Sequence, residues 1–126
     1  MKFVIKGNPT TKKNSMQIVN AGGRRMVIPS KQYREYEELA LWQLPKVFYA
    51  CPVNVKCVYY MQARRRVDLT NLLEATDDIL VKGHVLKDDS CDIIVSHDGS
   101  CVKYDKENPR VEVEITERNW ELWQTD

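Results

Sequence analysis

Residues 53–90 read VNVKCVYYMQARRRVDLTNLLEATDDILVKGHVLKDDS, and two periodicities follow one another in this stretch. From Val53 to Met61 every second side chain (Val53, Val55, Cys57, Tyr59, Met61) is apolar or aromatic, which predicts a β-strand with one face on a core. From Asp68 to Lys82 the apolar side chains recur at helical spacing, which predicts an amphipathic helix that Gly83 ends. The stretch therefore predicts a strand, a basic loop and a helix.

Shorter patterns on either side predict the remaining elements. The further strands expected are residues 2–6, 16–20, 25–28, 91–96, 101–104 and 111–115. Ala21-Gly22-Gly23 and His97-Asp98-Gly99-Ser100 each suggest a hairpin turn. A first helix is expected at 31–44, with Ser30 as its N-cap. Because no strand–helix–strand rhythm repeats, we expect an α+β fold, a mixed β-sheet with two main helices packed on it.

Length and composition favour a globular chain. The 126 residues are 29% charged and 43% hydrophobic, which is typical of one folded domain over residues 1–126. The tail, residues 117–126, carries Trp120 and Trp123. We expect this tail to pack on the domain, and a subunit interface is the alternative.

Several classes of protein are disfavoured. The chain has no long apolar run and its first residues lack the pattern of a signal peptide, so we expect a cytoplasmic location and no membrane partner. The four cysteines form no C-x-x-C pair, and the two histidines lie outside zinc-ligand spacing. We therefore expect free, mostly buried thiols rather than disulfides or a zinc site.

Acidic side chains gather on and after the predicted second helix. Those considered are Asp68, Glu74, Asp77, Asp78, Asp88 and Asp89. Asp68 has an alternative interpretation as a simple N-cap of the helix. If the chain turns back after Gly83, however, Asp89 comes against the helix start. Grouped carboxylates are hard oxygen ligands suited to Mg²⁺ or Mn²⁺, which can activate water to attack a phosphodiester.

Basic residues form three clusters although the net charge is only +1. The DNA-binding candidates are Lys12, Lys13, Arg24, Arg25, Arg64, Arg65 and Arg66. The arginine run lies directly before Asp68, so cations able to hold phosphates sit beside acids able to hold a metal. A solvated basic surface is the alternative interpretation.

The stretch from Val67 to Ser90 resembles the signature of the RusA-type Holliday junction resolvases. The resemblance lies in VDLTNLLE at 67–74, DDIL at 77–80 and GHVLKDDS at 83–90. Gly7-Asn8-Pro9 with Lys12-Lys13, and PSKQY at 29–33, also resemble family segments. The resemblance implies a homodimer that binds branched DNA and resolves four-way junctions by paired nicks with Mg²⁺ or Mn²⁺, in recombination and repair.

Carried over by position, the resemblance implies that Asp68 and Asp89 are the metal-binding acids, with Asp88 beside them. Two departures stand out: Thr70 replaces the second acid of the family motif, and Glu74 replaces its lysine. Glu74 lies one turn beyond Thr70 on the same side of the helix, so we expect it to supply the missing carboxylate. The pattern resembles a divergent phage-type branch of the family.

These patterns and the resemblance together predict the residues of the site. We expect Asp68, Glu74 and Asp89 to be catalytic and, with Asp88, to be metal ligands. Secondary candidates are Thr70, Asn71, Asp77, Asp78 and Lys82, of which Asp77 and Asp78 are expected only to solvate the helix. His84, the histidine near the motif in sequence, is expected to be a loop residue.

Two alternatives to the nuclease remain open at this point. A junction- or duplex-binding dimer that has lost cleavage is favoured by Thr70. An interaction protein that uses the tryptophans of the tail is the other, and it would show no salt-dependent DNA binding.

Overall fold

A five-stranded mixed sheet forms the centre of the computed structural model, which describes residues 1–12 and 16–118. Its strands are β1 (Lys2–Lys6), β4 (Val53–Met61), β5 (Ile94–Ser96), β6 (Cys101–Tyr104) and β7 (Arg110–Glu117). The order is β1-β7-β4-β5, with β6 also beside β4. β7 runs antiparallel to β1 and β4, whereas β5 and β6 run parallel to β4. The expected α+β fold with a mixed sheet is confirmed.

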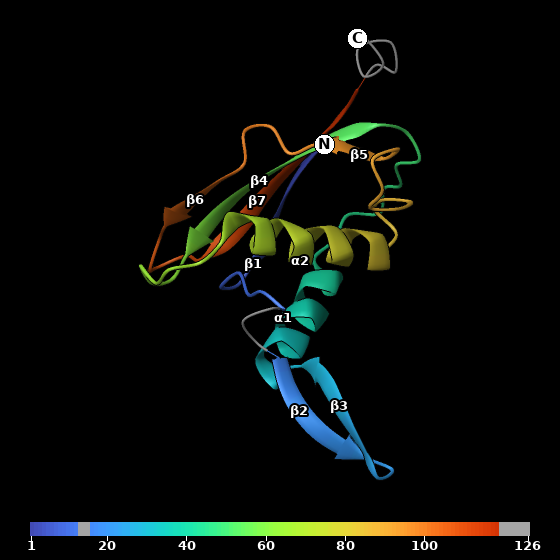
Figure 1. Cartoon of the computed structure of the whole chain (residues 1–126). Helices are drawn as coiled ribbons and strands as arrows, with labels where there is room; N and C mark the ends of the chain where they lie inside the picture. Colours follow the sequence, from blue (N-terminus) through green and yellow to red (C-terminus); the bar gives the residue numbers. More distant parts are fainter. Residues whose placement is uncertain (13–15, 119–126) are drawn as a thin grey trace.

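Two helices lie on one side of this sheet. α1 spans Lys31–Trp42 and α2 spans Leu69–Lys82. Figure 1 shows α2 crossing the sheet and α1 beside it, while a hairpin of β2 (Met16–Ala21) and β3 (Arg24–Pro29) projects beyond α1. Ser30 caps α1 as expected, since its hydroxyl accepts from the Tyr33 amide. α1 ends two residues before the predicted Leu44.

The core lies between α2 and the sheet. Val55, Cys57 and Tyr59 of β4 are at most 1% exposed, as are Leu72 and Ile79 of α2. The apolar side chains that alternate along β4 therefore face α2. A buried hydrogen bond of 2.7 Å between the Tyr59 and Thr76 hydroxyls adds a polar tie between the two elements.

The expected second hairpin is wrong. Residues 91–93 form a turn rather than strand, and β5 and β6 do not pair with each other but both follow β4 in the same direction. The segment His97–Ser100 thus interrupts a strand instead of reversing it. Turn residues such as Asp-Gly indicate a change of backbone direction, but they do not show that the next strand returns along the previous one.

Polar side chains hold this interruption against β4. Asn54, which is buried, accepts from the Asp98 amide at 2.8 Å and from the Ser96 hydroxyl at 2.5 Å. The Ser100 hydroxyl in turn accepts from the Cys57 amide at 3.0 Å. These bonds replace the ladder that a continuous strand would form.

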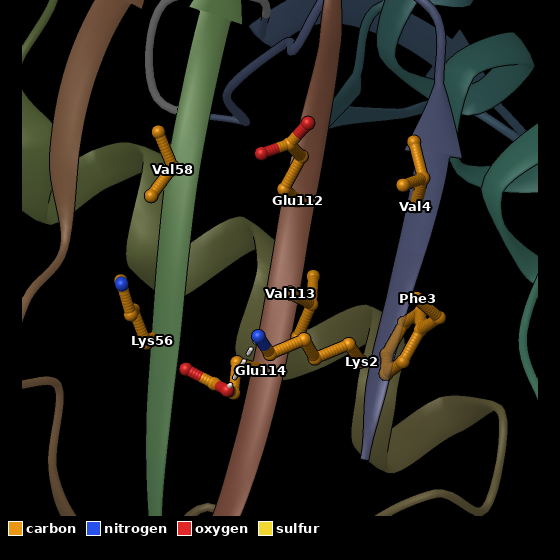
Figure 2. A pocket seen from close by; sticks show the side chains of 8 residues that line it. All are labelled: Lys2, Phe3, Val4, Lys56, Val58, Glu112, Val113 and Glu114. Carbon is orange, nitrogen blue, oxygen red and sulfur yellow. Dashed lines mark ion pairs between the residues drawn. The ribbon is translucent and has the colours of Figure 1, made fainter.

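Within residues 1–12 and 16–118, no helix covers the opposite face of the sheet. Figure 2 shows a shallow hollow over β1, β7 and β4, with α2 behind the strands. Val4 and Val58 line it, and Lys2 pairs with Glu114 at 3.5 Å across two strands. Its volume is about 290 Å³. An exposed ion pair of this kind contributes little to stability and indicates a solvated surface.

Three further expectations concern cysteines, membranes and the tail. The four thiols are free as expected, but only Cys57 is buried, and Cys91 is exposed. Among the described residues, no helix combines the length and apolar character needed to cross a membrane. Trp120 and Trp123 lie outside the described residues.

Removing one hydroxyl should test the tie between β4 and α2. Tyr59→Phe removes one of the two buried hydrogen bonds of the Thr76 hydroxyl and leaves the one it donates to the Leu72 carbonyl at 3.0 Å. We therefore expect the free energy of unfolding to fall by about 1 kcal/mol in urea titrations. Tyr60→Phe is the matched control, because the Tyr60 ring faces Arg110, 3.8 Å from its guanidinium carbon, and Phe keeps that ring. Equal stability of Tyr59→Phe and the parent would contradict the assigned role.

Candidate active site

One stripe of α2 faces a pocket of about 250 Å³. The pocket is lined by Thr70, Leu73, Glu74, Asp77, Asp89 and His97. The four helical residues lie at positions i, i+3, i+4 and i+7, so they share one side of the helix. Asp89 and His97 arrive from two later segments. The pocket therefore gathers three carboxylates and an imidazole from three parts of the chain.

Asp89 reaches the pocket because the chain is anchored after α2. Val85 and Leu86 are buried, and backbone bonds join Val85 and Lys87 to Tyr49 at 2.8 and 3.0 Å. These contacts direct the following residues back along the helix, as the sequence led us to expect. The Asp88 carboxylate accepts from the Asp89 amide at 2.8 Å, and Asp88 itself does not line the pocket.

His97 reaches the pocket because the strand is interrupted there. Its Nδ1 lies 2.7 Å from the Val55 carbonyl oxygen, and its Nε2 lies 2.9 Å from Asp77 Oδ2. A carbonyl oxygen only accepts, so Nδ1 carries a hydrogen. The contact between Nε2 and Oδ2 then requires a shared proton, which makes the pair an imidazolium–carboxylate ion pair or its neutral equivalent.

The pair is largely shielded from water. The side chains of His97 and Asp77 are 24% and 14% exposed. Burial raises the pKa of Asp77 above 3.8 although His97 opposes this, and the nearby Asp78 and Asp89 add to the rise. Burial lowers the pKa of His97, but Asp77 and the Val55 carbonyl outweigh it and leave the pKa above 6.5. Both groups therefore hold protons more tightly in the folded chain.

Asp77 also has an oxygen without a donor. Within residues 1–12 and 16–118, no hydrogen-bond partner reaches its buried Oδ1. Buried carboxylate oxygens normally find a donor, a water or a cation. The expectation that Asp77 only solvates the helix is wrong, because its carboxyl group is buried and paired.

The structure places some of the catalytic candidates in the pocket and leaves Asp68 outside it. Glu74 and Asp89 share the pocket, together with Thr70. Asp68 is the N-cap residue of α2, but its side chain makes no capping bond and does not line the pocket. Its carboxylate accepts instead from the side-chain Nδ2 of Asn71 at 3.4 Å.

Asp78 faces the other way from Asp77. Its carboxylate pairs with Lys12 at 2.9 Å, and the Lys12 ammonium also lies 5.7 Å from the centre of the Tyr33 ring. Lys82 pairs with Glu37 of α1 at 2.5 Å. These two lysines therefore connect α2 to its surroundings on the side away from the pocket.

His97 is the pocket residue that the sequence did not indicate. His84, although nearer to the motif along the chain, is exposed in the turn after α2. His97 lies 20 residues from Asp77 and 42 from Val55, so no local spacing connects them. Its position in a predicted hairpin turn directed attention away from it.

The arginine run lies exposed between β4 and α2, and its side chains help to line two pockets. One pocket, of about 450 Å³, includes Thr10, Arg65 and Arg66, and the other, of about 420 Å³, includes all three arginines and Tyr104. The Arg64 guanidinium lies 4.5 Å from the centre of the Tyr104 ring.

The other basic candidates are separate from this run. Arg24 and Arg25 are exposed where β3 begins, at the end of the projecting hairpin. Lys13 lies outside the described residues.

Comparison with protein-family models identifies the family of the chain. A family model described as endodeoxyribonuclease RusA matches residues 6–116. The chain belongs to the RusA endodeoxyribonuclease family. The match covers every residue of the pocket and the whole arginine run, so the family resemblance read from residues 67–90 is confirmed. No curated protein matches this RusA-family chain.

The donor set of the pocket fits a divalent cation. Glu74, Asp77 and Asp89 offer hard carboxylate oxygens, and the orphaned Oδ1 of Asp77 lacks a positive partner. Across the described ranges, no three His, Cys, Asp or Glu side chains already converge at ligand spacing. Like charges repel one another without a cation between them, so this spread is expected for carboxylates alone.

The raised pKa values of His97 and Asp77 predict how the stability of the fold depends on pH. The contribution of His97 is fully present below about pH 6.5 and is lost as the pH rises through its higher folded-state pKa. The raised pKa of Asp77 acts in the same direction from pH 3.8 upward. We expect the free energy of unfolding, measured with EDTA, to fall as the pH rises above about 6.5. In His97→Gln this fall should be smaller, and an unchanged slope in that variant would refute the assignment.

Proposed function

We propose that this protein is a divalent-metal-dependent endonuclease that resolves four-way DNA junctions by paired nicks. The observation that carries the proposal is the convergence of Glu74 and Asp89 in one pocket of a RusA-family chain. The family supports cleavage of DNA. The pocket supports a metal-assisted route, because it concentrates carboxylates on the helix that an exposed run of arginines precedes in the chain.

Glu74 and Asp89, which line the same pocket, would hold Mg²⁺ or Mn²⁺. A bound divalent ion would activate water and stabilise the charge that develops on the phosphate. Thr70 lines the same pocket one helical turn before Glu74. This supports the idea that Glu74 supplies the carboxylate missing at Thr70. Asp68 and Asp88 would act from just outside the pocket as further acids of the site.

The arginine run would hold the DNA backbone. Arg64, Arg65 and Arg66 lie between β4 and the start of α2, directly before the acidic stripe in the chain. Cations placed there can bind phosphates on both sides of a cut while the carboxylates hold the metal. Arg24 and Arg25, at the end of the hairpin, would contact a more distant part of the DNA.

A homodimer would explain paired nicks. A four-way junction has approximate two-fold symmetry, and two identical subunits related by a two-fold axis would place one pocket on each of two strands. The proposal therefore includes a second copy of the chain as partner.

A junction-binding dimer without cleavage is the second candidate. The observation that favours it is Thr70 at the position of a motif acid. The two candidates differ in whether DNA is cut, and not in whether it is bound.

Cleavage of a synthetic mobile four-way junction tests the proposal. We expect the parent chain to nick the junction with Mg²⁺ or Mn²⁺ and to be inactive with EDTA. Asp89→Asn and Glu74→Gln should each lower the rate by about 100-fold or more, because each removes a metal ligand. Both variants should still bind the junction in gel-shift measurements, since they remove negative charge near phosphates.

Asp92→Asn is the matched control. Asp92 is exposed, lies three residues after Asp89 and does not line the pocket, so its cleavage rate should stay near that of the parent. Junction binding without nicking in either metal would refute the nuclease and favour the second candidate. Full activity of Glu74→Gln would refute the replacement of the motif acid by Glu74.

Arg65→Ala tests the phosphate contacts. Arg65 lines both pockets beside the arginine run, so its loss should weaken junction binding and reduce the slope of log affinity against log salt by about 1. Lys2→Ala, on the face of the sheet opposite the helices, removes a positive charge elsewhere and should leave the slope near that of the parent. Equal slopes in all three proteins would show that Arg65 does not contact phosphate.

A further inference from the structure

We propose that Asp77 is an additional ligand of the divalent cation and that His97 is the positioning residue that orients its carboxylate. This inference rests on the proposed metal-dependent function and deepens it. It assigns a role to Asp77, which lies in the resembling segment 77–80 but had no role there, and to His97, which lies outside all the resembling segments.

The helix places Asp77 with the other acids of the pocket. Asp77 follows Glu74 by three residues and Thr70 by seven, so the three side chains lie along one stripe. The neighbouring Asp78 points away and pairs with Lys12. The two adjacent aspartates therefore have different surroundings, and only Asp77 shares the pocket with Asp89.

His97 is placed to orient a ligand rather than to be one. Both ring nitrogens are engaged by the protein, Nδ1 by the Val55 carbonyl and Nε2 by Asp77 Oδ2. A metal ligand would need one of these nitrogens free. Carboxylates that bind metals are commonly held by a hydrogen bond to their other oxygen, which fixes the angle of approach. His97 supplies such a bond to Oδ2 and leaves Oδ1 for the cation.

The position of His97 is itself strongly supported. Asn54 accepts from the residues on both sides of it, Ser96 and Asp98. The Arg118 guanidinium donates to the Ser96 hydroxyl at 3.0 Å and to the Asp98 carboxylate at 2.6 Å. A segment held on both sides in this way can present an imidazole in one orientation.

Burial explains why the pair would favour a cation. Asp77 has one donor, His97, and a buried Oδ1 for which the described residues provide no partner. An oxygen of this kind costs stability unless something positive reaches it. A cation in the pocket, held at the same time by Glu74 and Asp89, would remove that cost.

Two substitutions of His97 separate the proposed role from a merely structural one. The side-chain amide nitrogen of asparagine can take the place of Nδ1, and that of glutamine the place of Nε2. His97→Asn therefore keeps the bond to Val55 and loses the bond to Asp77, whereas His97→Gln does the reverse. Asp77→Asn removes the charge of the proposed ligand directly.

The measurement is Mn²⁺ binding to the whole chain without DNA, by titration calorimetry and by the loss of the free-ion electron paramagnetic resonance signal. We expect Asp77→Asn and His97→Asn to weaken Mn²⁺ binding by roughly 10-fold to 100-fold. His97→Gln should bind close to the parent value. Glu35→Gln, on the exposed side of α1, is the control for losing one carboxylate and should not change the affinity.

The possible outcomes are distinct. Parental affinity in Asp77→Asn, with binding lost in Asp89→Asn, would overturn this inference and leave the proposed function standing. Equal weakening in His97→Asn and His97→Gln would overturn the positioning role, because the bond to Val55 would then matter as much. No Mn²⁺ binding by the parent would overturn both proposals. If His97→Asn does not fold, Asp77→Asn still tests the proposed ligand, and weakened Mn²⁺ binding in His97→Gln would overturn the positioning role.

Discussion

The packing of α2 against β4 is the contact on which the site depends. The alternating apolar face of β4 and the apolar stripe of α2 bury one another, and the Tyr59–Thr76 hydrogen bond lies within this interface. Burial of one helix face turns another toward the pocket. The orientation of Thr70, Glu74 and Asp77 is therefore a consequence of hydrophobic packing, since side chains on a helix rotate together about its axis.

Charge is distributed unequally around α2. On the side toward α1, lysines neutralise acids: Lys12 pairs with Asp78 and Lys82 with Glu37. On the side toward the pocket, the imidazole of His97 meets Asp77 in a largely buried contact. Partly buried carboxylates in one pocket repel one another, and such an arrangement favours an additional cation. The same helix thus stabilises the fold on one side and presents the acids of the proposed metal site on the other.

The interruption between β5 and β6 connects β4 with the pocket side of α2. Between β5 and β6 the chain leaves the ladder for four residues, and Asn54, Arg118 and Ser100 replace the lost backbone bonds with side-chain bonds. The interruption brings His97 over β4 to α2. The residues of the interruption, His97–Ser100, are of types common in turns, and for that reason the sequence predicted a hairpin there. Pairing with β4 on both sides, and not turn chemistry, decides the direction of β6.

Local patterns in the sequence were enough to predict β1, β4, the β2–β3 hairpin and both helices, whereas the placing of Glu74 near Asp89 was expected from the family resemblance. Periodicity reports which face of an element is apolar, and motif spacing reports which residues share a helix side. The burial of Asp77, its contact with His97 and the exclusion of Asp68 from the pocket were decided by tertiary structure alone. Each depends on segments 20 or more residues apart meeting in the folded chain, or on the rotation of α2 about its axis, and neither leaves a local trace in the sequence.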